Sequence, residues 1–400
     1  MIGVVAVLII SAVVLNFTKA KYRVTQSIPL VNGTINYSPF DIKVISYYKN
    51  EILESFPEKN TVSFESISCD KGASATFNTK TWNITVSNLT DRGTKCSIYF
   101  KEKGPLLKNA ILAGKDIQER TDFSTTLSTN TNEIIYQETT NDGTTYYFAG
   151  DTNENWVSFA DFYWRIIRIN EDGSIRMIYN GTTTTQTGTQ LQTSVYNSLY
   201  DNNAYVGYMY TLNQVHGLGT DSEIKEVIDK WYEDNILDTQ YEQYISMEAG
   251  FCNDRTPYSG TGTGRNATTY AAYNRLVTNK TPSFRCTNSN DLFTVTGSSK
   301  GNGTLTYPIG LITADEVAYA GGVWGTNNTS YYLYTGQNYW TMSPYNVYIS
   351  GSAVLFIVNS DGDLAGWDGH SARGVRPVIN LDASVSATGL GTIDNPYVVE

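Results

Sequence analysis

The hydrophobic and polar positions of this chain repeat one arrangement, once near the middle and once near the end. Residues 353–358 are apolar at every position, which predicts a strand buried on both faces inside a sheet. Asn359-Ser-Asp-Gly362 then supplies residues that tolerate positive φ, and residues 364–367 can return as the partner strand. Residues 163–179 follow the same plan around Asn170-Glu-Asp-Gly173. Two similar hairpins are therefore predicted.

The first quarter of the chain alternates over shorter runs, which Asn, Gly and Asp turns separate. Such runs predict short strands. A small all-β, Ig-like sandwich over residues 22–103 is the architecture they favour, and we expect it to serve as a spacer. The predicted strands are residues 42–47, 61–64, 82–87 and 95–100.

Two further segments differ in their helical signal. Residues 104–133 are polar and carry no sustained period apart from an apolar patch at residues 106–112, so we predict a linker with one short helix. The clearest predicted helix is residues 220–235, where apolar side chains recur at intervals of three and four. Thr220 and Glu223 have the spacing of a capping box at its start.

Residues 2–15 form an uncharged apolar run, which predicts a membrane anchor or signal segment over residues 1–21. The run is shorter than the ~20 residues that span a bilayer. Lys19, Lys21 and Arg23 follow the run. If basic residues alone decided the orientation, the chain after the run would stay in the cytoplasm. The cysteines argue for export, and no convincing Ala-x-Ala cleavage site is present. We expect an uncleaved anchor with the rest of the chain outside the cell; a buried N-terminal helix is the alternative.

The four cysteines come as two pairs that are close in sequence, Cys69 with Cys96 and Cys252 with Cys286. Neither pair has the spacing of a metal site, and the chain has two histidines. We therefore predict two local disulfides formed in an oxidising compartment. Each would contribute on the order of 3 kcal/mol by closing a loop of about 30 residues. A reduced chain with buried thiols is the alternative.

The amino-acid composition limits the classes of partner that the chain can bind. The net charge is −11 and the basic residues form no cluster, so nucleic acid is excluded as a partner because phosphate binding depends on Lys and Arg. Thirty tyrosines and seven tryptophans accompany many Asn, Thr, Ser and Gly residues, a mixture typical of extracellular binding surfaces. At 400 residues the chain is too long for one core, and two or three domains are expected.

Several short motifs within residues 130–400 resemble those of a known protein family. They are Val157-Ser-Phe-Ala160, Trp164-Arg-Ile-Ile-Arg168, Phe251-Cys-Asn-Asp-Arg255, Tyr307-Pro-Ile-Gly-Leu-Ile312, Tyr339-Trp340, Ser343-Pro344 and Gly374-Val-Arg-Pro377. With these motifs the chain resembles a family of largely uncharacterised Gram-positive surface proteins. The resemblance implies an α+β fold, with a C-type-lectin-like (formylglycine-generating-enzyme-like) domain over residues 134–400. Sulfatase-modifying enzymes and the variable proteins of diversity-generating retroelements share that fold.

The same resemblance implies a ligand-binding face. In the retroelement variable proteins, that face is built from side chains on the last strands and loops of the domain, between the residues of a constant frame. Tyrosine and tryptophan would anchor a ligand there, and the polar residues would supply adaptable hydrogen bonds. An ordinary exposed hairpin is the alternative. The residues in that position are Tyr345, Asn346, Tyr348, Ser350, Trp367, Asp368 and His370.

Two patterns suggest an enzyme and fail in context. Gly297-Ser-Ser-Lys-Gly301 matches a nucleophile elbow, but no buried strand precedes it and no helical period follows it. Gly260-Thr-Gly-Thr-Gly264 resembles a dinucleotide loop in its glycines alone. The sulfatase-modifying branch of the fold uses a pair of cysteines in the C-terminal part of the domain, and this chain has none after Cys286. We therefore predict no enzymatic activity.

The second predicted turn contains oxygen ligands of the kind that Ca²⁺ prefers, in Asn359, Asp361 and Asp363. A simple hairpin turn explains these residues equally well. The calcium motifs of animal lectins are absent, and Trp367-Asp-Gly369 is the nearest fragment. We therefore predict no metal site and no cofactor, and Ca²⁺ at this turn is the alternative.

Together these features predict a membrane-anchored extracellular protein that binds a protein or glycan through its C-terminal face, in adhesion or ligand recognition. A protein diversified by a retroelement is one form of this hypothesis. The first alternative is a structural envelope protein whose lectin-like domain only packs against a neighbour. The second is an enzyme of the sulfatase-modifying type.

Overall fold

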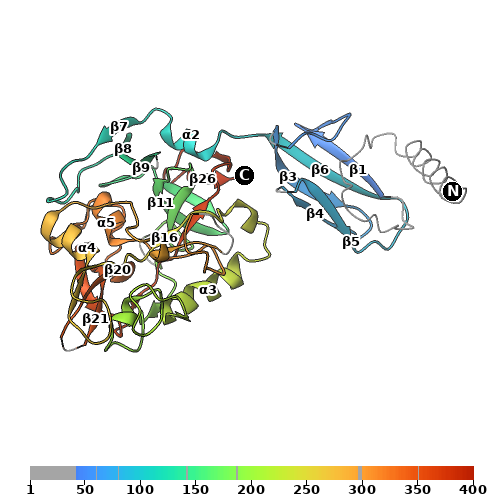
Figure 1. Ribbon diagram of the computed structural model, residues 1–400. Coiled ribbons are helices and arrows are strands. Elements are labelled where there is room, and N and C mark those ends of the chain that lie inside the picture. The colour runs from blue at the N-terminus through green and yellow to red at the C-terminus, as the bar shows by residue number, and fades with distance from the viewer. Residues whose placement is uncertain are drawn as a thin grey trace, which may run out of the picture. The chain divides into compact units, whose positions relative to one another are not determined.

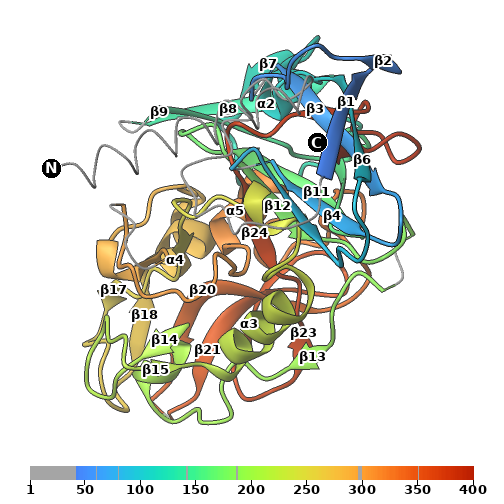
Figure 2. The same ribbon diagram turned by 90° about the vertical axis from the view of Figure 1, so that its right-hand side faces the viewer.

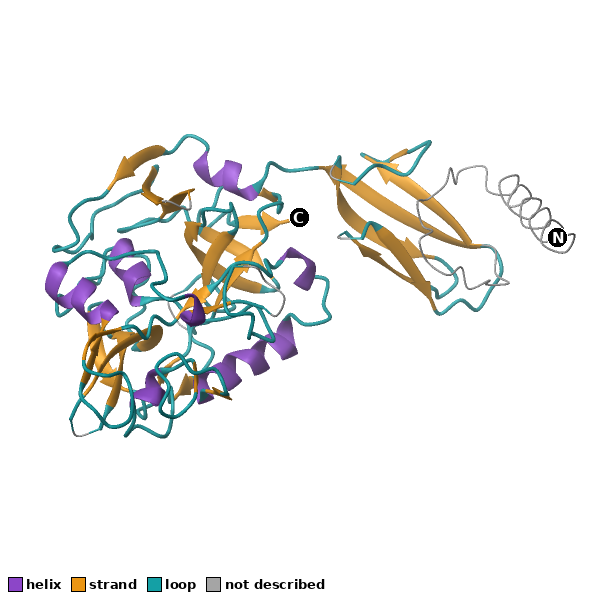
Figure 3. Cartoon of the chain, viewed as in Figure 1, coloured by secondary structure: helices purple, strands orange, loops and turns teal. Residues whose placement is uncertain are grey.

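The computed structural model describes residues 42–59, 61–79, 81–140, 143–185, 188–295, 300–349 and 351–400. Strands predominate over helices in these residues, as Figure 3 shows. The predicted anchor over residues 1–21 lies outside the described residues. Among the described residues, no helix is both long enough and apolar enough to cross a membrane.

The chain divides into two compact units, Met1–Gly104 with Glu400, and Pro105–Val399. The division falls at the predicted end of the first domain, but the predicted linker at residues 104–133 differs from the structure. The short helix is present as α2 (Leu107–Leu112), yet its Leu107 and Ile111 are fully buried in the core of the second unit. The apolar patch of α2 is too short to distinguish a core helix from a linker helix by period.

The described part of the first unit is all β. β1 runs parallel to β6, which pairs antiparallel with β3, and a separate hairpin joins β4 to β5. The sheet order is β2-β1-β6-β3. The strands are β1 (Ile42–Tyr48), β2 (Glu51–Ile52), β3 (Val62–Cys69), β4 (Ser74–Asn78), β5 (Asn83–Ser87) and β6 (Thr94–Glu102).

Aromatic side chains form the core of the first unit. Phe77 from the β4–β5 hairpin packs edge-on against Phe100 of β6, with ring centroids 5.8 Å apart, so the hairpin and the sheet share one core. Cys69 and Cys96 lie directly opposite each other in the β3–β6 register and form a disulfide, as predicted. The second predicted disulfide, Cys252–Cys286, is also present, in the second unit.

The second unit contains two large sheets. The one that we call the β11 sheet has the order β25-β26-β10-β11-β9-β8-β7, and β12 pairs with both β11 and β24. The β11–β12 hairpin is the first of the two predicted from the sequence. The strands are β7 (Asp116–Glu119), β8 (Ile134–Thr140), β9 (Gly143–Tyr147), β10 (Trp156–Phe159), β11 (Phe162–Ile169), β12 (Ile175–Tyr179), β24 (Val378–Leu381), β25 (Ala387–Thr388) and β26 (Tyr397–Val399).

The other sheet, which we call the β20 sheet, has the order β13-β23-β20-β18-β17, and β21 pairs with β20 and β22. Every residue of β21 is buried between these neighbours, which confirms the predicted central strand. Figure 2 shows β18, β20 and β21 side by side. The strands are β13 (Thr193–Ser194), β17 (Pro257–Ser259), β18 (Thr268–Tyr270), β20 (Tyr339–Val347), β21 (Ala353–Val358), β22 (Leu364–Asp368) and β23 (Arg373–Gly374).

Helices and short strand pairs make up the rest of the second unit, and Figure 1 labels α3, α4, α5 and β16 among them. Two of the helices, α3 (Glu223–Asn235) and α5 (Ala314–Ala320), are longer than the others of the second unit. The remaining elements are β14 (Met209–Tyr210) paired with β15 (Thr220–Asp221), β16 (Phe251–Cys252) paired with β19 (Leu292–Phe293), α4 (Ala271–Tyr273), η1 (Asn203–Val206), η2 (Glu242–Tyr244), η3 (Asn274–Asn279) and η4 (Ser289–Asp291).

The start of α3 was predicted wrongly, and α5 was not predicted at all. The predicted capping box at Thr220 is wrong, because Thr220 pairs with β14 and the helix α3 begins after Ser222, whose hydroxyl accepts from Lys225 N. A capping box does exist, at the start of α5, between Thr313 and Glu316. The sequence did not predict α5, since all its residues are buried and it shows no amphipathic period.

A buried arginine links the two sheets. Arg376 is fully buried and donates to the carbonyl oxygens of Tyr179 and Leu333, at 3.1 and 3.2 Å, and to Asn180 Oδ1 at 3.0 Å. Its guanidinium lies 4.7 Å from the ring centroid of Tyr339. These contacts compensate for the lost hydration of the cation and hold the end of β12 against the start of β20.

Candidate functional site

Three segments that are distant in sequence meet where β20 turns into β21. Ala353 N donates to the carbonyl oxygen of Tyr200 at 2.8 Å, and Gly369 N donates to the carbonyl oxygen of Ala353 at 2.9 Å. These backbone hydrogen bonds bring residues 197–201 and 368–371 to the β20–β21 turn. The end of the β20 sheet is thus built by backbone contacts, which leave its side chains available to solvent.

Large side chains are exposed at this end of the sheet. Ile349, in the β20–β21 turn, is 88% exposed, and Tyr348 beside it is 50% exposed. Trp367, near the end of β22, is 41% exposed. We call this set the loop face; its members are Leu199, Tyr200, Tyr348, Ile349, Trp367 and His370.

Two ring contacts order the loop face. The rings of Tyr200 and His370 lie 4.6 Å apart, which joins two of the three segments through their side chains. The guanidinium of Arg373 lies 4.3 Å from the ring centroid of Trp367, a cation–π contact. Side chains held in this way lose less conformational entropy when a partner binds.

The structure separates the predicted ligand-binding residues into groups. Tyr348, Trp367 and His370 are exposed on the loop face, and Asp368 is partly buried beside them. Asn346 is partly buried, and its Oδ1 lacks a hydrogen-bond partner. The prediction for Ser350 lies outside the described residues.

The predicted role of Tyr345 as an anchor is at odds with the structure. Tyr345 is 8% exposed, and its ring packs between Tyr273 and Phe356, at 4.8 and 4.9 Å. The β20–β21 register shifts on both sides of Pro344, so simple alternation along β20 does not hold there. Tyr345 therefore belongs to the core and not to the loop face.

Other residues of the loop face were not predicted. Leu199 and Tyr200 reach it through a long-range backbone hydrogen bond, and no local pattern indicates such a contact. Ile349 carried a usable signal, because a β-branched apolar residue is unusual in a hairpin turn. Composition alone does not show which of thirty tyrosines are exposed.

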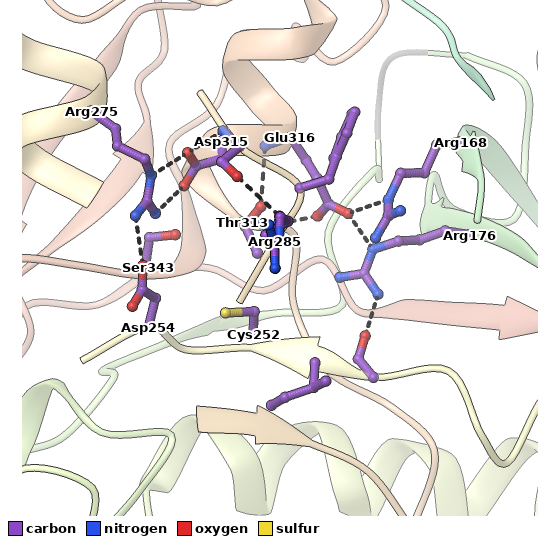
Figure 4. Close-up of a pocket in the computed structure, with 14 residues that line it drawn as sticks. Arg168, Arg176, Cys252, Asp254, Arg275, Arg285, Thr313, Asp315, Glu316 and Ser343 are labelled. Atoms are coloured by element: carbon purple, nitrogen blue, oxygen red, sulfur yellow. Dashed lines mark hydrogen bonds and ion pairs between the residues drawn. The ribbon is translucent and has the colours of Figure 1, made fainter. Parts of the chain in front are cut away.

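A second candidate site is a charged pocket, drawn in Figure 4. Glu316, at the start of α5, accepts from Thr313 N at 2.9 Å. Its carboxylate also pairs with the Nε atoms of Arg176 and Arg168, at 2.5 and 3.2 Å. Both arginines come from the β11–β12 hairpin. The carboxylate therefore ties α5 to the β11 sheet.

A second ion-pair group lines the same pocket. Arg275 donates to both carboxylate oxygens of Asp315, each at 2.9 Å, and to Asp254 Oδ2 at 2.7 Å. Asp254 is buried, has a positive φ of 31°, and its Oδ1 has no hydrogen-bond partner. The cavity beside these groups has a volume of about 40 Å³, which is enough for water to satisfy such an oxygen.

The charges of this pocket are stabilised by one another. Burial alone would raise the pKa of Glu316, but the guanidinium groups of Arg176 and Arg168 hold that pKa below its usual value. Burial alone would lower the pKa of Arg275, but Asp315 and Asp254 raise it. Glu316 and Arg275 therefore remain charged at neutral pH.

Charged side chains make up half of the residues that line the pocket. Cys252 is in a disulfide, and the lining residues, all described, include no histidine and no free cysteine. An adjoining cleft of about 520 Å³ shares Arg168, Phe284 and Arg285 with the pocket. The ion pairs of Glu316 and Arg275 join neighbouring segments, so this arrangement forms a charged frame within the second unit.

The turn between β21 and β22 places two carboxyl groups together. Asp363 is 9% exposed, and burial together with the neighbouring carboxyl of Asp361 raises its pKa to about 6. Among the described residues, no group of three or more His, Cys, Asp or Glu side chains is arranged to hold a metal ion. The nucleophile-elbow motif lies largely in residues that are not described.

Compared with known proteins, the chain matches no family model, no curated protein and no solved structure. The assignment of a function therefore depends on the chemistry of the two candidate sites.

Proposed function

We propose that this chain is a surface protein that recognises a protein ligand through the loop face. The observation that carries the proposal is the set of large apolar and aromatic side chains exposed together where the three segments meet, with Ile349 88% exposed and Tyr348 and Trp367 about half exposed. A monomeric protein rarely exposes such a group of side chains without a partner.

The composition of the loop face favours a protein over a glycan. Leu199 and Ile349 are aliphatic, and a sugar ring offers them little contact area, whereas a protein partner can bury them. Tyrosine, tryptophan and arginine are the residues that contribute most to protein interfaces, and Tyr200, Trp367 and Arg373 are held in place by ring contacts.

The setting of the proposal is the cell surface. Two disulfides indicate an extracellular or otherwise oxidising environment. In this proposal, residues 1–21 anchor the chain to the membrane, the first unit acts as a spacer, and the second unit is a C-type-lectin-like domain. The two sheets joined through Arg376, with loops gathered at one end, support that assignment.

The two alternatives make different demands on the same residues. A structural envelope protein would use the loop-face side chains for packing against a neighbour, without selectivity for a ligand. An enzyme of the sulfatase-modifying type needs reactive cysteines, whereas all four cysteines of the chain are in disulfides. The lining of the charged pocket includes no free cysteine.

The test is a binding screen of the full chain against arrays of extracellular proteins and of glycans, beside a variant with Tyr348→Ala and Trp367→Ala. We expect protein hits that the variant loses while its unfolding free energy is unchanged. Glycan hits lost in the variant would keep the loop face as the site but contradict the protein ligand. No hit on either array, or hits that the variant keeps, would favour the structural alternative.

A further inference from the structure

The turns of the two predicted hairpins have the same backbone structure. Their sequences are Asn170-Glu-Asp-Gly-Ser174 and Asn359-Ser-Asp-Gly-Asp363. Gly173 N donates to Asn170 O at 2.8 Å, and Gly362 N donates to Asn359 O at 2.9 Å. The two glycines have φ values of 86° and 83°. Asp172 and Asp361 are therefore equivalent positions, as are Ser174 and Asp363.

The first turn is balanced in charge. Ser174 Oγ donates to Asp172 Oδ1 at 2.6 Å, and Lys300 Nζ lies 3.1 Å from Asp172 Oδ2. One carboxylate thus has a hydroxyl donor and a cation as partners.

The second turn has a second carboxyl group where the first has the hydroxyl. The Asp363 carboxyl lies within hydrogen-bonding reach of the side chains of Asp361 and Asn359. Asp363 is nine-tenths buried, and its Oδ1 has no hydrogen-bond partner. Among the described residues, neither Asp361 nor Asp363 forms an ion pair like that of Asp172 with Lys300. The second turn therefore has two neighbouring carboxyl groups, one with an unpartnered buried oxygen, and no ion pair from a described residue. The first turn has one carboxylate, which Lys300 neutralises.

We propose that the β21–β22 turn binds a divalent hard cation, with Ca²⁺ as the ion that fits its ligands. The side chains of Asn359, Asp361 and Asp363 would each supply one or more oxygens, the Asn359 amide turning its Oδ1 to the ion. Oxygen ligands at every second residue of a turn suit Ca²⁺, which accepts six to eight oxygens in flexible geometry and completes its shell with water. In the second turn the ion would neutralise the carboxylates, as the Ser174 hydroxyl and Lys300 stabilise Asp172 in the first turn. This inference is independent of the proposed ligand at the loop face.

The experiment uses the full chain after removal of metal by a chelator. Titration with CaCl₂ in a calorimeter is expected to show one ion per chain with a Kd of about 10⁻⁴–10⁻³ M, the range of extracellular calcium modules. About 10 mM CaCl₂ is expected to raise Tm by about 2–4 °C through linkage. MgCl₂ is expected to have little effect, because Mg²⁺ demands a tighter octahedral shell.

The decisive variant is Asp363→Ser, which gives the second turn the sequence pattern of the first. Since Ser174 shows that serine fits this backbone, the variant is expected to fold and to lose both the heat of Ca²⁺ binding and the rise in Tm. Asp172→Asn, in the first turn, is the matched control and is expected to keep the response to Ca²⁺.

Tb³⁺ luminescence tests whether the ion binds at the β21–β22 turn itself. The ring of Tyr334 lies beside Gly362, with a ring carbon 3.2 Å from where a Cβ on that glycine would be, so tyrosine excitation is expected to sensitise Tb³⁺ emission in the wild type. A wild-type chain with no Ca²⁺ heat and no change in Tm would overturn the proposal. So would an Asp363→Ser variant that binds Ca²⁺ and Tb³⁺ as the wild type does, because the ion would then lie elsewhere.

Discussion

Tyr200 and His370 come from distant parts of the chain, and their rings lie 4.6 Å apart at the end of the β20 sheet. The backbone beneath them is joined as well, since Tyr200 O accepts from Ala353 N at 2.8 Å. The loop face is therefore a surface assembled by the fold of the second unit. A surface of this kind can hold its side chains in position before a partner arrives, and its members can be changed without altering the core.

Residues of the loop face and of the core should respond differently to truncation. We expect Tyr348→Ala or Trp367→Ala to change the free energy of unfolding by less than about 1 kcal/mol, because both side chains are about half exposed. Tyr345→Ala should cost about 3–5 kcal/mol, because it leaves a cavity between Tyr273 and Phe356. Urea unfolding measures all three. Similar losses for the three variants would place Tyr348 and Trp367 in a packing role.

Removal of the Glu316 charge should destabilise the second unit. Glu316→Gln leaves Arg168 and the fully buried Arg176 without their shared anion, and breaking a buried pair in this way costs about 3–5 kcal/mol. Glu171→Gln is the control, because Glu171 pairs with Arg168 at 3.5 Å and is more exposed. We expect it to cost less than about 1 kcal/mol in the same unfolding assay. Equal effects of the two changes would contradict a structural role for Glu316.

The same carboxylate predicts a dependence of stability on pH. The folded-state pKa of Glu316 lies below its usual value, so the unfolded state binds the proton more tightly. The stability that Glu316 contributes is fully present above its unfolded-state pKa of about 4.3 and is lost as the pH falls through the folded-state value. Unfolding free energies measured from neutral pH down to pH ~3 should fall less steeply for Glu316→Gln than for the wild type. Parallel curves would show that the Glu316 pairs do not contribute to acid stability.

Gly362 should not tolerate a side chain. Its φ is 83°, and an added Cβ would lie 1.8 Å from the carbonyl oxygen of Asn328, which belongs to the backbone and cannot rotate away. Gly325 has a similar φ of 65° with no atom within 4 Å of an added Cβ. We expect Gly325→Ala to cost about 1 kcal/mol, from its conformation alone, and Gly362→Ala to cost clearly more. Thermal unfolding compares them, and equal changes in Tm would mean that the backbone at Asn328 moves freely.

The sequence predicted those elements whose pattern is local. Residues 353–358 are apolar throughout, and the structure buries every side chain of β21 between two neighbouring strands. The β11–β12 and β21–β22 hairpins and both disulfides follow from patterns within a few tens of residues. The helix α5 was not predicted, because a short helix that is buried on all sides has no amphipathic period.

The candidate sites depended on contacts that local patterns do not contain. Tyr345 was predicted as a binding residue from the family resemblance, by its place between the frame residues, and the irregular register at Pro344 places it in the core. Leu199 and Tyr200 reach the loop face through a backbone hydrogen bond to Ala353. The pairing of Arg275 with Asp254 and Asp315 likewise joins three distant segments. Sequence position therefore identified part of the loop face and none of the charged pocket.

The central claim is that the loop face binds a protein ligand, and the most direct measurement compares three forms of the full chain on an array of extracellular proteins. They are the wild type, the Tyr348→Ala, Trp367→Ala variant, and Ile117→Ala, which changes an exposed apolar residue of the β11 sheet. We predict that the wild type and Ile117→Ala bind the same proteins, and that the double variant loses them with an unchanged free energy of unfolding. Equal binding by all three forms would contradict the account.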